Sequence, residues 1–387
     1  MADIKERVPG QPDASQQNKE SKRSWREGMF RAEQREKRIA VFAPIVSVVL
    51  ALLVGAVIIA CLGKSPIEGY AAMLQGSLGD ASKIAKTLER ACPLVFTALA
   101  AVFAYKCGVF NLGGEGQFIM GGCAAATVAL TCGLEGPVAL VLSLLAGLVA
   151  GGLWGLIPGI MKITRGLNEM ITTIMLNYIA LYFMEFLYKN VFSDQGLPQT
   201  AAMPKSSHLA DLGNVHAGVL IAVVVGVLLW YVIFRTSFGF KIRAVGMSQT
   251  ASRVNGFPVR TLMLLAFVIS GAIAGLGGAV ELFGRTPFRL AEGFGSGFGF
   301  DGVAIALIAQ LNPVASLVVA VLFGMLSTGG TMMQSVIGVP TAIVDIIRGL
   351  IIIFAVAGMA SVKLPAVRSW IGALGTKNKD KKAEVAA

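Results

Sequence analysis

Long apolar runs recur along this chain, and several approach the twenty residues that a helix needs to cross a bilayer. Only 14% of the 387 residues are charged and the mean hydropathy is +0.72, whereas a soluble domain has about 25% charged residues. A water-soluble globule of this composition would expose large apolar patches. These properties exclude a soluble domain, a disordered chain and a disulfide-built secreted module, and they predict an all-α integral membrane protein.

The spacing of the apolar runs predicts a polytopic bundle of about ten transmembrane helices, or eight if a short run is re-entrant. We expect the mixed polar segment 64–90 and the polar loop 193–214 to be external. The expected spans are 39–62, 91–105, 118–132, 138–161, 170–192, 215–234, 261–283, 302–311, 314–328 and 341–359.

Basic residues indicate the orientation of these spans. The chain has 33 Lys and Arg against 22 Asp and Glu, a net charge of +11, and Lys and Arg are enriched in the cytoplasmic loops of membrane proteins. We therefore expect a multi-pass protein of the cell membrane with both termini cytoplasmic, and membrane lipid rather than nucleic acid as a partner. The expected parts are a charged N-terminal tail at 1–38, a transmembrane domain at 39–361 with a basic cytoplasmic segment at 235–260, and a Lys-rich C-terminal tail at 362–387.

One pattern occurs in both halves of the chain. Glu115-Gly116 follows the glycine-rich segment 108–114, and Asp301-Gly302 follows the glycine-rich segment 293–299. Each acid-glycine pair opens a short apolar run, five spans apart, so the two runs cross the membrane in opposite directions. This pattern is typical of two inverted five-helix repeats with short, glycine-interrupted helices at the central site.

The segment 108–117 carries three polar side chains, Asn111, Glu115 and Gln117, beside its glycines. Irregular backbone at membrane depth is tolerated only inside protein or along a wet cavity. Two interpretations stay open: the three side chains contact a polar solute, or Glu115 caps the helix that begins at 118 by accepting from its free N–H groups.

A second polar set lies at the start of the fifth expected span. Glu169, Thr173 and Asn177 are spaced four residues apart and share one helix face. Such a face points into the bundle, where it forms hydrogen bonds between helices or lines a solute pathway.

No enzyme motif accompanies these residues. Gly63-Lys64-Ser65 resembles the end of a phosphate-binding loop, but Ile58 stands where that motif needs its first glycine. The five cysteines and two histidines form no metal-ligand spacing. We expect no catalytic residue, no metal site and no cofactor in this chain, so that energy from ATP must come through a partner.

The segment 235–260 is suited to contact such a partner. Ser248 is placed to cap a short helix over the residues that follow it. A short helix across the cytoplasmic mouth would serve as a contact for a motor protein, or it would lie on the bilayer surface, held by lipid phosphates.

Several motifs together resemble the permeases of ABC importers for simple sugars and nucleosides, closest to the nucleoside type. They are GVFNLGGEGQF at 108–118, LNEMITTIMLNYIA at 167–180, RAVG at 243–246, and GFGFDGVAIAL at 297–307 followed by NP at 312–313. Two departures occur: Thr172 replaces the usual serine, and the stretch 248–257 lacks the usual proline and tyrosine. The resemblance covers about residues 40–360.

The resemblance implies a pair of permeases, either two copies of this chain or this chain with a second permease. It also implies two cytoplasmic ATPase subunits that bind ATP and Mg²⁺, and an extracytoplasmic solute-binding protein or lipoprotein. The residues that it implies for coupling to the ATPase are Arg243, Gly246, Thr250, Ala251, Arg253 and Gly256. In such an importer, we expect the polar residues noted above to line or shape the translocation pathway: Asn111, Glu115, Gln117, Glu169, Asn177 and Asp301.

The leading hypothesis is an ABC importer permease that moves a nucleoside or simple sugar by alternating access. The alternative is a stand-alone, ion-coupled secondary transporter in which Glu115, Glu169 and Asp301 bind a cation. A membrane-embedded enzyme or scaffold is a third possibility, disfavoured because no nucleophile or metal constellation accompanies the spans.

Overall fold

A computed structural model describes residues 46–133, 136–194 and 196–361. They fall into two compact units. One unit contains the described residues 46–52 and 353–361, which begin the helix Val46–Cys61 and end the helix α13 (Thr341–Ser361). The other contains residues 53–352. The expected tails at 1–38 and 362–387 lie outside the described residues.

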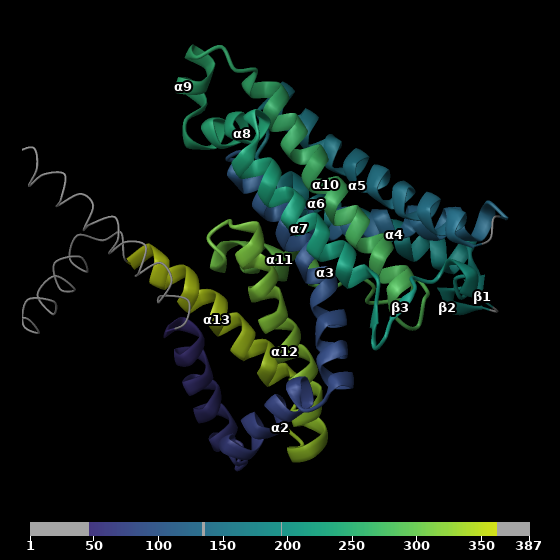
Figure 1. The fold of residues 1–387 in the computed structure, drawn as a ribbon, viewed down its shortest axis with the longest axis vertical. Helices are drawn as coiled ribbons and strands as arrows, with labels where there is room; N and C mark the ends of the chain where they lie inside the picture. Colours follow the sequence, from purple (N-terminus) through teal and green to yellow (C-terminus); the bar gives the residue numbers. More distant parts are fainter. Residues whose placement is uncertain (1–45, 134–135, 195, 362–387) are drawn as a thin grey trace, which may run out of the picture. The chain divides into compact units, whose positions relative to one another are not determined.

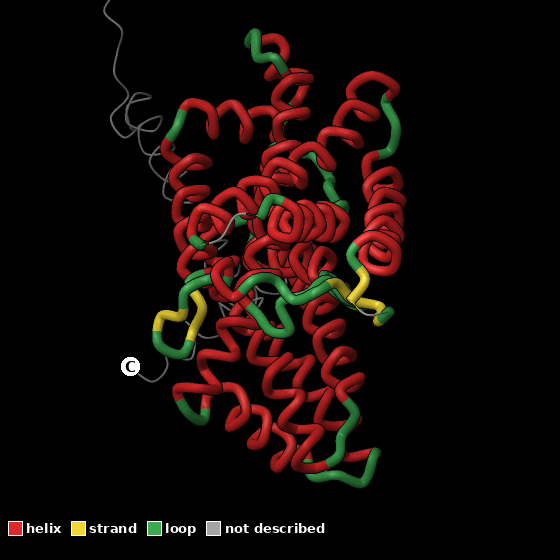
Figure 2. The backbone as a smooth tube through the Cα atoms, turned by 90° about the vertical axis from the view of Figure 1, so that its right-hand side faces the viewer, coloured by secondary structure: helices red, strands yellow, loops and turns green. Residues whose placement is uncertain are grey.

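The unit 53–352 consists mainly of helices, and its strands form two short antiparallel hairpins (Figures 1 and 2). The helices are α2 (Pro66–Leu78), α3 (Ala81–Lys106), α4 (Gly114–Thr131), α5 (Pro137–Arg165), α6 (Glu169–Phe186) with a π-helical continuation (Leu187–Val191), α7 (Gly218–Arg235), α8 (Ser237–Met247), α9 (Gln249–Val254), α10 (Val259–Gly284), α11 (Phe298–Ile308) and α12 (Pro313–Ile337). A 3₁₀ turn (Lys205–Ser207) separates the hairpin β1 (Ser193–Asp194) with β2 (Leu197–Thr200) from the hairpin β3 (Asp211–Leu212) with β4 (Val215–His216).

Six helices within the described residues are long and apolar enough to cross a membrane: α3, α5, α6 with its π-helical continuation, α7, α10 and α12. The helices Val46–Cys61 and α11 are apolar but shorter. This agrees with an all-α protein of several spans. The total of ten spans stays a prediction.

The mixed polar segment 64–90, expected to be external, is mostly helical. It contains α2 and the first turns of α3, which begins at Ala81 rather than at 91. Asp80 caps α3 by accepting from the backbone N–H of Lys83 at 2.9 Å. The expected span 91–105 is therefore the later part of a longer helix, because charged side chains interrupt an apolar run without breaking a helix. Similarly, α12 continues to Ile337, beyond the expected end at 328. The external position of 64–90 stays a prediction.

Helices α4, α5 and α10 pack through glycines, and Figure 1 shows α5 and α10 side by side. A Cβ on Gly151 of α5 would lie 2.3 Å from the carbonyl oxygen of Gly271, and one on Gly275 of α10 would lie 2.4 Å from that of Gly147. A Cβ on Gly121 of α4 would lie 2.2 Å from the Gly275 oxygen. Small residues permit this approach, and close packing drives helix association in a bilayer, where burial from water contributes little.

The two glycine-rich segments meet in space. A Cβ on Gly299, in the first turn of α11, would lie 2.3 Å from the backbone nitrogen of Glu115, in the first turn of α4. The N-termini of the two short helices therefore converge, although they lie far apart in the sequence. Helix α3 lies beside this junction, since a Cβ on Gly302 would lie 2.3 Å from Oγ1 of Thr97.

Candidate translocation and coupling sites

Asn111 lies in a buried hydrogen-bond network that fixes the glycine-rich loop before α4. Its side chain is 2% exposed. Its Nδ2 donates to Oε1 of Gln117 at 3.0 Å and to Oγ of Ser270 at 2.9 Å, while its Oδ1 accepts from the backbone N–H of Gly113 at 2.9 Å. These bonds tie the loop to α4 and α10. Sequence reasoning had no signal for Ser270, which is an isolated serine in an apolar helix.

Helix α6 holds the same loop from the other side. Asn177 donates from Nδ2 to the carbonyl oxygen of Leu112 at 3.0 Å and accepts at Oδ1 from the N–H of Gly116 at 2.8 Å. Oγ1 of Thr173 accepts from the N–H of Leu112 at 3.3 Å. Thr173 and Asn177 of the expected polar face thus make hydrogen bonds between segments. Glu169 does not join them, because its carboxylate pairs with Nζ of Lys162 at 2.6 Å.

Glu115 lies at the junction of α4 and α11. Its carboxylate lies against the backbone N–H groups of Gly297 and Gly299, which begin α11. Helix α4 begins at Gly114, and its N-cap residue Gly113 has no capping side chain; the Glu115 carboxylate lies instead against the first N–H groups of the neighbouring helix. Convergence of two helix N-termini, each with a partial positive charge, favours an anionic side chain here.

Asp301 is separate from this network. Its carboxylate accepts from Nη1 of Arg348 in α13 at 3.1 Å, and the same guanidinium lies 3.5 Å from Asp345. Asp301 is therefore neutralised by a partner that sequence reasoning did not pair with it. Of the six expected pathway residues, the structure brings Asn111, Gln117 and Asn177 into one network.

The segment 235–260 folds into α8 and α9, and the predicted short helix capped by Ser248 is confirmed. Oγ of Ser248 accepts from the N–H of Ala251 at 3.2 Å. Apolar side chains on either side of this cap are exposed to solvent: Met247 is 89% and Val254 84% exposed. Five of the six residues expected to couple to a partner are exposed: Gly246, Thr250, Ala251, Arg253 and Gly256. An exposed apolar pair beside them suits a protein contact.

Helix α8 is anchored to the end of α3. A Cβ on Gly246 would lie 2.2 Å from the carbonyl oxygen of Lys106. The ring of Phe234 lies between two cations, with Nζ of Lys106 at 5.6 Å and Cζ of Arg243 at 5.3 Å from its centroid. Both distances are within the range of a cation–π interaction. Gly246 and Arg243 therefore hold α8 against the end of α3 and the ring of Phe234.

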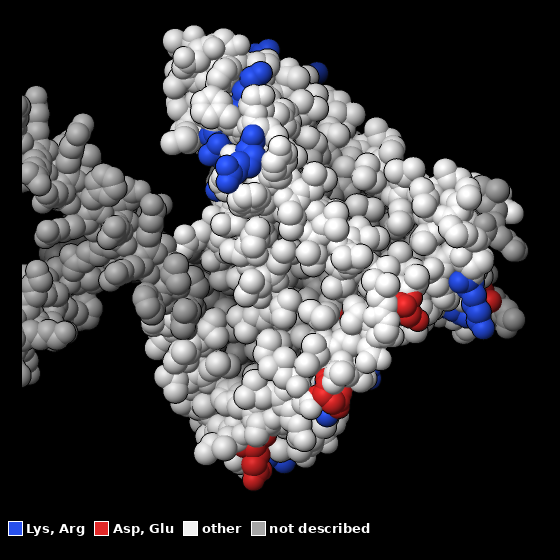
Figure 3. All heavy atoms as spheres, in the orientation of Figure 1, with Lys and Arg blue, Asp and Glu red and all other residues white. Residues whose placement is uncertain are grey.

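Charge differs between the two ends of the unit 53–352. On the face seen in Figure 3, the end with α8 and α9 shows Lys and Arg without an acidic side chain. The helix ends and loops at that end contain eight cations and one acid, Glu169; the cations are Lys106, Lys162, Arg165, Arg235, Lys241, Arg243, Arg253 and Arg260. At the opposite end, the segments between residues 80 and 292 carry both basic and acidic side chains (Figure 3).

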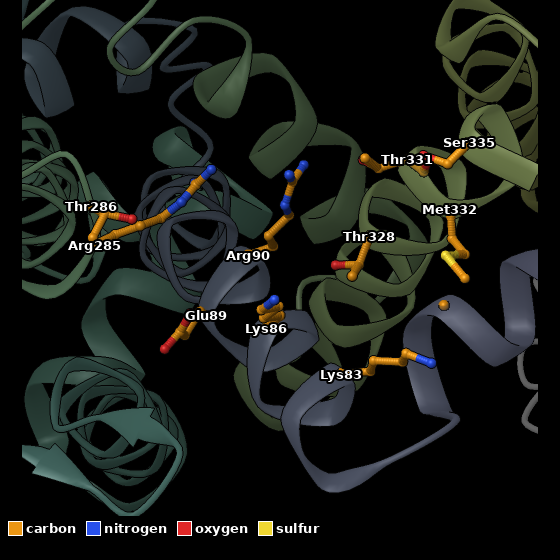
Figure 4. A pocket seen from close by; sticks show the side chains of 11 residues that line it. Lys83, Lys86, Glu89, Arg90, Arg285, Thr286, Thr328, Thr331, Met332 and Ser335 are labelled. Carbon is orange, nitrogen blue, oxygen red and sulfur yellow. The ribbon is translucent and has the colours of Figure 1, made fainter.

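Two cavities lie at that opposite end. The larger, of about 460 Å³, lies between α3, α12 and the end of α10. Figure 4 shows Lys86 and Arg90 on one side of it, Arg285 on another and the hydroxyl of Thr328 on α12. The smaller, of about 250 Å³, shares Arg285 with the larger and extends to Phe298 at the start of α11. Sequence reasoning missed both, because their side chains come from segments distant in the sequence.

No group of three or more His, Cys, Asp or Glu that could hold a metal ion occurs within the residues that the structure describes.

Comparison with known proteins identifies the class to which this fold and these sites belong. Residues 83–356 match the family described as branched-chain amino acid transport system / permease component. The chain is 36% identical over 334 residues to the guanosine ABC transporter permease protein NupP of Bacillus subtilis, covering 84% of this chain and 95% of the relative. It is 34% identical over 358 residues to the nucleoside ABC transporter permease protein NupB of Lactococcus lactis, covering 89% and 98%. It is also 32% identical over 333 residues to the glucose ABC transporter permease protein TsgB13 of Haloferax volcanii, covering 82% and 87%.

The chain belongs to this family of transport-system permeases. It is a multi-pass membrane protein and the permease subunit of an ABC transporter, a transport component and not itself an enzyme. Family membership decides against the stand-alone ion-coupled transporter. The site agrees with this, since two of the three carboxylates required by that alternative, Glu169 and Asp301, are already paired with cations.

Proposed function

We propose that this permease translocates a nucleoside into the cell, with a simple sugar as the second candidate solute. The observation that carries the proposal is the match over most of the chain to relatives named for guanosine and for nucleosides. The relative named for glucose is somewhat less similar and keeps the sugar as the alternative. A nucleoside combines a sugar with a flat base, so both kinds of solute require hydroxyl recognition.

Transport would proceed by alternating access between two inverted five-helix repeats, within a bundle of about ten spans. The meeting of the α4 and α11 N-termini, at Glu115 and Gly299, supports this division. Asn111, Gln117 and Asn177 would then hold the irregular loop beside the pathway in shape, Glu115 and Asp301 would stabilise the second short helix, and Glu169 would lie at the inner mouth.

The end with α8 and α9 would face the cytoplasm, with both chain termini on that side and the transmembrane domain spanning 39–361. Its excess of eight cations over one acid supports this orientation. The segment 235–260 would bind a cytoplasmic ATPase subunit through the exposed surface at Thr250, Ala251, Arg253 and Gly256, while Arg243 and Gly246 anchor it. The tails at 1–38 and 362–387 would be cytoplasmic.

A working transporter would also need partners that this chain does not provide. Two ATPase subunits would bind ATP and Mg²⁺, since no cofactor is proposed for the permease. A second permease, identical or different, would complete the membrane core, and an extracytoplasmic solute-binding protein or lipoprotein would deliver the solute.

The proposal is tested by reconstituting the permease with its ATPase, a second permease where needed and the solute-binding protein in liposomes. Ala251→Trp and Gly256→Trp should lower copurification of the ATPase and ATP-driven nucleoside uptake, because the new side chains obstruct the contact. Val224→Trp, at a position 56% exposed on α7, is the matched control and should leave both unchanged. Unchanged ATPase binding and uptake in both variants would contradict the coupling role. If the wild type takes up free sugars but not nucleosides, a simple sugar replaces the nucleoside as the proposed solute.

A further inference from the structure

The smaller cavity at the end opposite α8 and α9 has the chemistry of a solute-binding site. Its volume is about 250 Å³, and it is bounded by the end of α10, the following loop and the start of α11. Ligand pockets in proteins have volumes of about 300–1,000 Å³, so this cavity is suited to a small solute. It lies beside the junction of α4 and α11, because Phe298 of its lining belongs to the first turn of α11.

Glu281 provides an unused acceptor in this cavity. Its side chain is 8% exposed, and Oε1 accepts from Nη1 of Arg285 at 2.8 Å. Oε2 is buried and has no hydrogen-bond partner among the described residues. A buried carboxylate oxygen without a donor is costly, and an ionised carboxylate accepts several hydrogen bonds. A ligand with neighbouring hydroxyl groups would supply the missing donors.

Two phenylalanine rings provide an apolar side to the same cavity. Phe294 and Phe298 are partly exposed and line it. Both pack on Phe118 of α4, with ring centroids at 5.7 and 5.6 Å. The support of Phe118 holds the two rings in place. A flat heteroaromatic ring stacks well on such a surface, because aromatic rings pair through their faces and edges.

The charges that line the cavity are largely paired within the protein. Arg285 pairs with Glu281, and Arg289 pairs with Asp194 of β1. The remaining charged side chain, Glu292, is exposed. The neighbouring larger cavity differs, because Lys83, Lys86, Arg90 and Arg285 outnumber its one carboxylate, Glu89. The smaller cavity is thus suited to an uncharged solute and the larger one is not.

We propose that this cavity binds a ribonucleoside before translocation, with Glu281 accepting from the ribose hydroxyls and Phe294 and Phe298 stacking on the base. The inference rests on the proposed function and assigns residues to its outer solute site. Binding here would place the solute beside the converging N-termini of α4 and α11, where Gly295 and Gly297 give the loop positive φ values of 76° and 81°.

The test measures uptake of guanosine and of 2′,3′-dideoxyguanosine by the full transporter in liposomes. The solute-binding protein is kept identical, so that a change in the ratio of the two uptake rates reports on the permease. Glu281→Gln should reduce the preference for guanosine about tenfold, because a site built to bind hydroxyls loses its advantage for the ligand that has them. Phe294→Leu should lower the uptake of both compounds about tenfold through the lost stacking.

Matched controls are Glu185→Gln, a half-buried carboxylate paired with Lys189, and Phe183→Leu, a ring 42% exposed on α6. Both should behave as wild type. If Glu281→Gln fails to assemble with the ATPase, Phe294→Leu still tests the cavity. Wild-type ratios and rates in assembled variants would overturn the site while leaving the proposed function intact. Absence of uptake of any nucleoside by the wild type would overturn the proposed function itself, and this inference with it.

Discussion

Gly108 and Gly246 touch through their backbones: a Cβ on Gly108 would lie 3.2 Å from the Cα of Gly246. Gly108 has a φ of 75°, which favours glycine, and it opens the loop whose Asn111 is bonded to Ser270 of α10. The helix α8 therefore contacts the loop that leads into the buried polar network. Through this contact, movement of α8 would reach α4 and α10 without passing through the bilayer-facing side chains.

Gly246→Val should uncouple transport. The added side chain would clash with the carbonyl oxygen of Lys106, so α8 must shift, and overpacking of this kind costs about 1–3 kcal/mol. We expect uptake to fall about tenfold or more while the ATPase still copurifies, because the exposed surface of α9 is unchanged. Gly349→Val is the control, since a Cβ there meets no atom within 4 Å. Full uptake by Gly246→Val would show that this contact is dispensable.

Asn177→Ala should destabilise the protein. It leaves the carbonyl of Leu112 and the N–H of Gly116 without their side-chain partner, and each unsatisfied buried group costs about 1–3 kcal/mol. The melting temperature of the purified permease in detergent should fall by several degrees. Tyr178→Ala alters the next residue, which is 54% exposed, and should change the melting temperature little. Equal melting temperatures for the two variants would contradict a structural role for Asn177.

The loop between α6 and α7 should lose stability in acid through His216. Burial lowers the pKa of this imidazole, nearby Arg285 lowers it further and Asp211 opposes them. Because the folded pKa lies below the ordinary value of about 6.5, the stabilisation is complete above that pH. It is lost as the pH falls through the lowered folded pKa. The protection factor of the Gly218 amide, which donates to Nδ1 at 3.1 Å, should fall below about pH 6.5 in hydrogen exchange.

His216→Asn keeps an acceptor near the Gly218 amide and removes the titrating ring. Exchange at Gly218 in this variant should follow only the intrinsic pH dependence of amide exchange. The same loss of protection in the variant as in the wild type would assign the acid effect to another group.

Two adjacent glycines of α5 should respond differently to alanine. A Cβ on Gly151 would lie 2.3 Å from the carbonyl oxygen of Gly271, whereas one on Gly152 would lie 3.3 Å from that of Val268. Gly151→Ala forces α5 and α10 apart and should strongly reduce the yield of folded protein. Gly152→Ala needs only a small shift and gains up to about 1 kcal/mol of helix propensity. Comparable yields of both variants in size-exclusion profiles would contradict the close packing of these helices.

Much of the fold could be predicted from the pattern of apolar runs. The length of the apolar runs identifies spans such as those in α5, α7 and α10, because the bilayer itself imposes this length. The start of α3 could not be found in this way. Lys83, Lys86 and Arg90 precede the expected start of the span at 91, yet they belong to the same helix and line a cavity that other helices complete. Their environment depends on α12, which lies more than two hundred residues away in the sequence.

The polar residues show the same limit. The motif around Asn111 and the face with Thr173 and Asn177 were visible in the sequence, and so was the choice between solute contact and hydrogen bonds between helices. The partners were not visible, because Ser270, Arg348 and the N–H groups of Gly297 and Gly299 are brought close only by packing. The cavity at Glu281 was missed because a glutamate near the end of an apolar helix gives no sign of what faces it.

The sequence by itself determined that this chain spans a membrane, since it has too few charged residues to cover its apolar segments in water. Its motifs also indicated the transporter class that the comparisons confirm. The tertiary structure alone decided which polar groups share a site. A local sequence pattern indicates whether a segment lies in lipid or in water. The contacts of Glu115 with α11 and of Gly108 with Gly246 depend instead on close backbone packing between segments distant in the chain.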